Sequence, residues 1–161
     1  MIFISMTKLI ITTKQFNILR EHLEEEIDPS EASEDSKALD TVINKKRNVA
    51  FLISRGKYGL DNLKKAVDAG LGVIKFNQDN NPNKLGYMVY NHGYEKQAQE
   101  LANIAIKWDG YLPCAPDQGI SADEVFRIGR LLGYNRDSVV QFVCDKFNLS
   151  PNYFKDINIY P

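Results

Sequence analysis

Residues 49–90 most constrain the fold, because strand-like and helix-like apolar patterns follow each other there without a break. A short apolar run at 49–53 leads into a basic, glycine-containing loop at 54–59. The next residues have the apolar spacing of one helical face, and Gly70 is a typical helix stop. The apolar positions are Leu60, Leu63, Ala66 and Val67. This order predicts a strand, a tight basic loop and a short helix.

Two further strands are predicted at 73–77 and 85–90 from their β-branched and aromatic residues. The segment between them, 78–84, is almost entirely made of turn-forming residues, so the pair is expected to form a hairpin. With a short strand at 8–12, the sequence predicts an α+β fold with a small mixed or antiparallel sheet. Its centre is a β-α-β-β unit, and helices cover the sheet.

Composition is that of an ordinary globular protein. Of the 161 residues 43% are hydrophobic, and the formal net charge is −1, which does not favour a general nucleic-acid or membrane binder. Cys114 and Cys144 lie 30 positions apart without the spacing of metal ligands. We therefore expect no metal site, no cofactor and no disulfide framework. The expected location is the reducing cytoplasm, without a membrane span.

The N-terminal region predicts an acidic amphipathic helix after Thr12. Its apolar stripe consists of Phe16, Leu19, Leu23 and Ile27. Its other face and the following residues carry Glu21, Glu24, Glu25, Glu26, Asp28, Glu31, Glu34 and Asp35. Pro29 is expected to end this helix, and 30–36 are expected to form an exposed, mobile loop.

A second helix is predicted at 36–46, and the charge inverts at its end. Its inward residues are Leu39, Val42 and Ile43. The segment 45–65 then carries several cations against a single carboxylate, Asp61. The cations are Lys45, Lys46, Arg47, Arg55, Lys57, Lys64 and Lys65. Either the acidic helix folds over this basic surface and both are solvated faces, or the basic loop at 54–59 meets an anion.

The C-terminal third predicts a helix, a linker and a helical hairpin. The helix at 94–108 has a buried stripe of small and apolar residues, namely Ala98, Leu101, Ala102, Ala105 and Trp108. A proline-containing linker without periodicity follows it. These features divide the chain into an α+β core domain at 1–110, a linker at 111–120 and a helical hairpin at 121–161.

The hairpin begins with the best local signal in the chain. Ser121 and Glu124 have the spacing of a capping box, and Ile120 and Val125 can form its hydrophobic staple. Gly133 is expected to end the first helix. The second restarts near Asn135, and a short turn opens at Ser150 and Pro151. The inward residues are predicted to be Val125, Ile128, Leu131, Leu132, Val139, Val140, Phe142, Val143 and Phe147.

The basic loop resembles two known binding motifs. Gly56-Lys-Tyr-Gly59, with the helix and strands after it, resembles the GXXG region of a KH domain, which implies binding of single-stranded nucleic acid. That family places a helix before the loop, whereas the apolar run at 49–53 fits a strand as well as a helix. Ser54, Gly56, Gly59 and Asp61 also resemble the strand-to-helix turn of Rossmann-like nucleotide-binding folds, where the helix N-terminus holds a phosphate. The alternative is that the glycines serve only a tight turn.

Other functional patterns are weak. The hairpin at 121–147 suggests a helix-turn-helix, but its charges balance and give no basic recognition face. A nucleophile and base pair from Cys114 and His92 is conceivable, since both are expected in loops. No activating neighbour accompanies them in the sequence. We therefore expect a protein that is not an enzyme, with no catalytic residue and no metal ligand.

The resulting functional hypothesis is a non-catalytic binding protein. Its partner would bear phosphate, as a single-stranded nucleic acid or a nucleotide, and would bind Ser54, Arg55, Gly56, Lys57, Tyr58 and Gly59. The alternative is a protein-interaction or assembly component without nucleic-acid binding. The opening Lys8-Leu-Ile-Ile-Thr12, followed by Lys14-Gln-Phe16, resembles the start of many small phage-encoded proteins, which implies an accessory or virion role. The sequence is compatible with an oligomer as well as a monomer.

Overall fold

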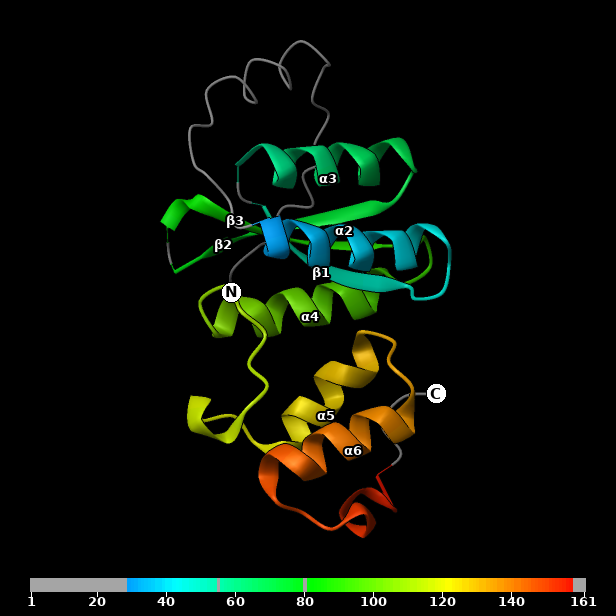
Figure 1. The fold of residues 1–161 in the computed structure, drawn as a ribbon, viewed down its shortest axis with the longest axis vertical. Helices are drawn as coiled ribbons and strands as arrows, with labels where there is room; N and C mark the ends of the chain where they lie inside the picture. Colours follow the sequence, from blue (N-terminus) through cyan, green and yellow to red (C-terminus); the bar gives the residue numbers. More distant parts are fainter. Residues whose placement is uncertain (1–28, 55, 80, 158–161) are drawn as a thin grey trace.

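The structure, a computed structural model, describes residues 29–54, 56–79 and 81–157 (Figure 1). The predicted strand at 8–12 and the predicted acidic helix at 12–28 lie outside these residues. The long elements are α2 (Pro29–Ile43), β1 (Val49–Ser54), α3 (Gly56–Asp68), β2 (Gly72–Gln78), β3 (Asn81–Tyr90), α4 (Glu95–Lys107), α5 (Ala122–Leu131) and α6 (Arg136–Phe147). Two 3-10 turns, η1 (Pro116–Gln118) and η2 (Pro151–Phe154), complete the described chain.

The three strands form one sheet in the order β1-β3-β2. Both pairings with β3 are antiparallel, so β1 and β2 run in the same direction on either side of it. Helix α3 connects β1 to β2, and the hairpin then inserts β3 between them. This is a split β-α-β arrangement. It confirms the predicted α+β fold with a central β-α-β-β unit.

Helices cover both faces of the sheet (Figure 1). On β3, Tyr87 and Val89 pack with α2 and α3, whereas Met88 and Tyr90 pack with α4 on the other face. This alternation follows from the two-residue period of a strand. Helices α5 and α6 lie beyond α4 (Figure 1), and their core residues join the same apolar cluster as those of α4.

Residues 29–36 are helical, so the prediction of a mobile loop there was wrong. Helix α2 begins at Pro29, where proline fits because first-turn amides need no helical partner. The side chain of Asp35 then accepts a hydrogen bond from the backbone N–H of Ile53 at 2.8 Å. At its other end α2 stops at Ile43 instead of 46, and Lys45 has a positive φ of 57°.

Two details of the β-α-β-β unit also differ from expectation. Val67 was predicted to face inward but is 44% exposed. It lies about 100° around α3 from the fully buried Ala66, beyond the stripe that α2 and the sheet cover. The hairpin turn is shorter than 78–84, because β3 already begins at Asn81. The register shifts near Gln78, so residues 82–84 form a bulge.

The ends of α5 and α6 are set largely by local chemistry. Ser121 Oγ accepts a hydrogen bond from the Glu124 backbone N–H at 3.2 Å, and Asn135 Oδ1 accepts one from Asp137 N–H at 2.9 Å. Gly133 follows α5 with φ of 84°. Both predicted helix starts and the predicted stop are therefore confirmed.

Two aromatic residues of the hairpin were assigned incorrectly. Phe142 was expected inside but is 43% exposed. Phe126 was not predicted as core, yet it is fully buried and stacks on Phe154 of η2 with ring centroids 4.6 Å apart. The chain after α6 folds back over α5 and buries Phe126, a long-range contact that the periodicity of α5 does not reveal.

Gly86 should be indispensable to the sheet. It lies on β3 beside the stacked rings of Phe51 and Phe76, whose centroids are 5.7 Å apart. A Cβ at Gly86 would lie 2.4 Å from a ring carbon of Phe76. Gly86→Ala should therefore lower the free energy of unfolding by about 1–3 kcal/mol, measured by urea denaturation. Asn77→Ala, an exposed change on β2, is the control, and equal midpoints for both variants would contradict the prediction.

Ser121→Ala removes the hydrogen bond that begins α5. It should lower the free energy of unfolding by roughly 0.5–2 kcal/mol, because an orphan amide loses its acceptor. Ser138→Ala changes the same side chain inside α6 and should shift stability by less than about 0.5 kcal/mol. A urea midpoint unchanged by Ser121→Ala would show that α5 does not depend on this cap.

Candidate functional site

The predicted anion-binding loop is the junction between β1 and α3. Ser54 is the last residue of β1, and Gly56 to Gly59 form the first turn of α3. Arg55 lies outside the described residues. The junction is therefore a helix start and not an open loop, and Gly59 is buried within it. Because the first amides of a helix have no partner within it, a helix start is a place where an anion can bind.

The charge of this turn is suited to an anion. Helix α3 has 13 residues and no acidic residue in its first turn, so this turn itself supplies no carboxylate to the positive end of the helix dipole. The sequence places Lys57 in the same turn, where a cation is unfavourable for the helix alone.

The fold divides the basic residues of 45–65 into separate groups. Lys64 pairs with Asp68 at 2.5 Å, and Lys65 pairs with Asp40 of α2 at 2.6 Å. The segment 45–47 precedes β1, whereas Lys57 lies in the first turn of α3 after it, so a strand about 20 Å long separates the two groups. The segment is thus not one continuous basic patch, and Lys65 supports the view that α2 packs over part of this surface.

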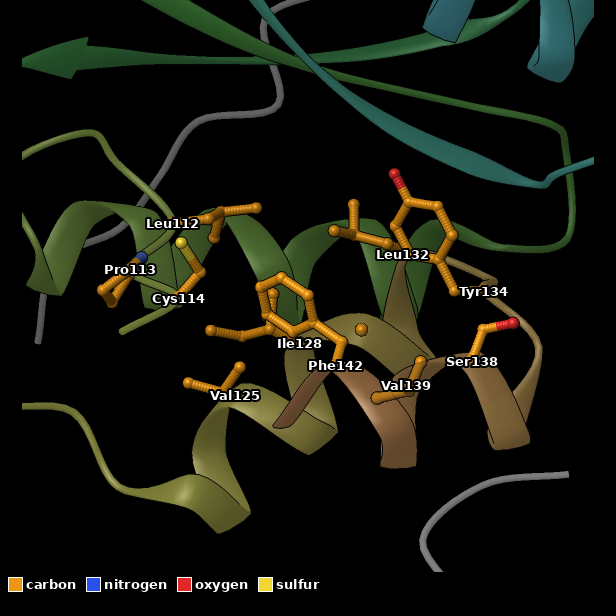
Figure 2. Close-up of a pocket in the computed structure, with 11 residues that line it drawn as sticks. Leu112, Pro113, Cys114, Val125, Ile128, Leu132, Tyr134, Ser138, Val139 and Phe142 are labelled. Atoms are coloured by element: carbon orange, nitrogen blue, oxygen red, sulfur yellow. The ribbon is translucent and has the colours of Figure 1, made fainter. Parts of the chain in front are cut away.

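A second candidate site is an apolar pocket beside α5 and α6, with a volume of about 390 Å³. Its walls come from the linker, α5, the turn after α5 and α6 (Figure 2). The lining residues are Leu112, Pro113, Cys114, Val125, Ile128, Gly129, Leu132, Tyr134, Ser138, Val139 and Phe142. The size is within the range of small-molecule sites, and nearly all of the lining is apolar.

Two aromatic rings of this pocket are unusually accessible. Phe142 is 43% exposed and Tyr134 is 47% exposed, and each has a cation beside it. The guanidinium of Arg47 lies 4.3 Å from the Tyr134 ring centroid, and its Nε donates to the Leu132 carbonyl at 2.9 Å. The Lys146 ammonium lies 5.8 Å from the Phe142 ring centroid. The pocket is therefore an apolar hollow with a partly cationic rim.

Gly129 keeps α5 and α6 close together along this pocket. A Cβ at Gly129 would lie 2.8 Å from a methyl carbon of Val139. The two helices can therefore approach at Gly129, and the pocket lies where their remaining side chains do not close over the contact. Sequence reasoning did not find this pocket, because its residues belong to the apolar stripes that were assigned to the core. The only available signal was the wide apolar stretch from Val139 to Val143.

The structure does not support a catalytic pair of Cys114 and His92. Cys114 is exposed and lines the pocket beyond the C-terminal end of α4. His92 precedes the opposite end of α4, where its Nδ1 lies 3.9 Å from Glu95 Oε1. Since α4 is about 20 Å long, the two residues follow and precede opposite ends of this helix and are not neighbours along it. Within residues 29–54, 56–79 and 81–157, no group of three or more His, Cys, Asp or Glu could hold a metal ion.

None of the described helices combines the length and the apolar character needed to cross a membrane.

No protein-family model, curated protein or solved structure matches the chain. The order of elements differs from that expected of a KH domain, because strand β1 and not a helix precedes Gly56. The Rossmann-like resemblance retains the strand-to-helix turn, but the pairings of the described sheet are antiparallel.

The two thiols should differ strongly in reactivity. Burial, and next the neighbouring Asp145 carboxylate, raise the pKa of the Cys144 thiol above its ordinary value. Less of Cys144 is then thiolate at pH 8, and the thiolate is the nucleophile. Native protein should therefore be alkylated by iodoacetamide at Cys114 well before Cys144, as read by peptide mass spectrometry. In urea the two rates should converge, and equal rates in the native state would contradict the burial of Cys144.

Proposed function

We propose that this chain is a non-catalytic binding protein that recognises a phosphate-bearing partner at the start of α3. The partner would be a single-stranded nucleic acid or a nucleotide, held by Ser54, Arg55, Gly56, Lys57, Tyr58 and Gly59. The observation that carries the proposal is that α3 begins at Gly56 with no acidic residue in its first turn. The helix start supplies amide donors, and glycine lets a ligand approach the backbone closely.

The chemistry favours phosphate over other anions. Backbone amides at a helix N-terminus and two nearby cations match a group with several charged oxygens. Tyr58 adds an aromatic ring in the same segment of sequence, which suits stacking on a base. The free cysteines of the described chain fit the reducing cytoplasm that the sequence suggests.

Replacing Arg55 and Lys57 together by Ala tests the proposal. Binding to single-stranded RNA or DNA should weaken, and the slope of log K against log salt should fall by about 1.4, because two fewer phosphates are neutralised. Filter binding at several salt concentrations measures both effects. Stability should change by less than about 0.5 kcal/mol.

The matched control is Lys64→Ala with Lys65→Ala, which also removes two positive charges and does so from the helix that contains Lys57. Both lysines are already paired with carboxylates, so this variant should bind nearly as wild type. If both double variants bind equally weakly, the effect is one of net charge and not of the α3 start. If the wild-type chain binds neither nucleotides nor single strands at low salt, the proposal fails.

The second candidate is a protein-interaction or assembly component. The exposed rings of Phe142 and Tyr134 beside an apolar pocket favour it, because aromatic anchors dominate many protein interfaces. An accessory or virion role of the phage type, suggested by the opening residues alone, would belong to this candidate. It predicts that Phe142→Asp abolishes partner capture, whereas Gln141→Asp on the exposed side of α6 does not.

A further inference from the structure

The apolar pocket beside α5 and α6 has two ends that differ in chemistry. Figure 2 shows Leu112, Pro113 and Cys114 at one end and Tyr134 with Ser138 at the other. Tyr134 and Ser138 each bring a hydroxyl group, whereas the opposite end offers only a thiol, which is a weak hydrogen-bond donor. The lining residues between the two ends are apolar, and none of the lining residues is charged. An occupant should therefore have an apolar body and one polar end.

The guanidinium of Arg47 lies beside the hydroxyl end of the pocket and is held there by two hydrogen bonds. Its Nε donates to the Leu132 carbonyl at 2.9 Å, and its Nη1 donates to the Tyr134 hydroxyl at 3.3 Å. A guanidinium has five N–H groups and the hydroxyl has a proton of its own, so donors are left for a further acceptor. None of the ion pairs within the described chain includes Arg47. A fixed cation without a carboxylate favours an anion at this end.

A second guanidinium holds the same turn. Arg130 Nη1 donates to the Tyr134 carbonyl at 2.7 Å, and Arg130 is also absent from the ion pairs of the described chain. Asp137, exposed in the first turn of α6, offsets part of this charge. Two guanidinium groups against one carboxylate leave a single positive charge around the turn. That balance suits a singly charged carboxylate better than a doubly charged phosphate monoester.

The volume of the pocket suits a hydrocarbon chain. The pocket measures about 390 Å³, whereas an apolar cavity of about 150 Å³ already holds benzene. Its walls come from the linker, α5, the turn after α5 and α6 (Figure 2). A hollow with walls from four segments accommodates a slim chain more readily than the broad face of a helix. Burial of the chain would supply most of the affinity, and the charged end would orient it.

We propose that the pocket binds a small amphipathic acid, a medium-chain carboxylate whose hydrocarbon chain lies along α5 and α6 toward Cys114 and whose carboxylate lies at Arg47 and Tyr134. The guanidinium and the Tyr134 hydroxyl donate to the carboxylate oxygens. The apolar residues between the two ends bury the chain. This inference does not rest on phosphate binding at the start of α3, because it concerns a different site and a different ligand.

Octanoate and octanol test the role of the charge, because they share a chain length and differ in the head group. In calorimetric titrations of the full chain, octanoate should bind at least about fivefold more tightly, since hydrogen bonds to a charged group are the stronger ones. Arg47→Gln should remove this preference while octanol still binds, which shows that the pocket is intact. Lys146→Gln is the matched control. It removes a charge 5.8 Å from the Phe142 ring centroid and away from the hydroxyl end, so it should keep the preference.

Alkylation by iodoacetamide locates the ligand. Cys114 is exposed and lines the pocket, whereas Cys144 is buried. Saturating octanoate should slow alkylation of Cys114 several-fold and leave the Cys144 rate unchanged. Inorganic phosphate at the same ionic strength should protect neither thiol, because it has no chain to fill the pocket. This arm separates the pocket from any anion site at the start of α3.

Tyr134→Phe keeps the aromatic ring and removes the hydroxyl. It should weaken octanoate more than octanol, and it decides the result if Arg47→Gln loosens the pocket and loses both ligands. A preference for octanoate that survives Tyr134→Phe undiminished would then contradict the proposed position of the carboxylate.

Four other outcomes would overturn the proposal. Equal affinities for octanoate and octanol, or no binding of either, would show that the pocket does not select an acid. A preference that survives Arg47→Gln or disappears in Lys146→Gln would place the carboxylate elsewhere. Octanoate binding that leaves the Cys114 rate unchanged would show that the ligand occupies another site. Protection of Cys114 that rises with protein concentration, without ligand, would show that a second copy covers the pocket.

Discussion

Strand β3 is the constraint on which the rest of the structure depends, because it pairs on both sides and packs on both faces. Its residues 85–90 are in register with β1 on one side and with β2 on the other. Val89 and Met88 are both fully buried, although they point to opposite faces of the sheet. The described sheet has three strands, and a small sheet of this kind is stable when helices bury its faces. Strand β3 therefore contributes residues to the cores on both faces of the sheet.

Helix α4 extends this arrangement from a sheet to a layered molecule. Ala98, Ala102 and Ala105 are fully buried, and such small side chains let α4 lie close to its neighbours. One side of α4 packs on β2 and β3, and α5 packs against it from the other direction. Arg47 adds a long-range link, since its Nε donates to the Leu132 carbonyl at the end of α5. The helical hairpin is thus held both through the core and from the sheet layer.

The two candidate sites arise from different consequences of this packing. The start of α3 is a candidate site because a strand passes into a helix after one residue, and the first amides of a helix have no partner within it. The apolar pocket exists because Gly129 brings α5 and α6 together at one point, while the linker at 111–114 covers them only partly. The first site depends on polar backbone groups, and the second depends on incomplete burial of apolar surface.

Local sequence determined the elements whose cause is local. Ser121, Asn135 and Gly133 fix helix ends through their own hydrogen bonds and conformation. The helical spacing of apolar residues indicated the buried stripe of α4, and β-branched and aromatic residues indicated β3. Tertiary structure decided which apolar residues are inside. Val67 and Phe142 are exposed and Phe126 is buried, because burial depends on which distant segment arrives to cover a face, and no local pattern specifies that segment.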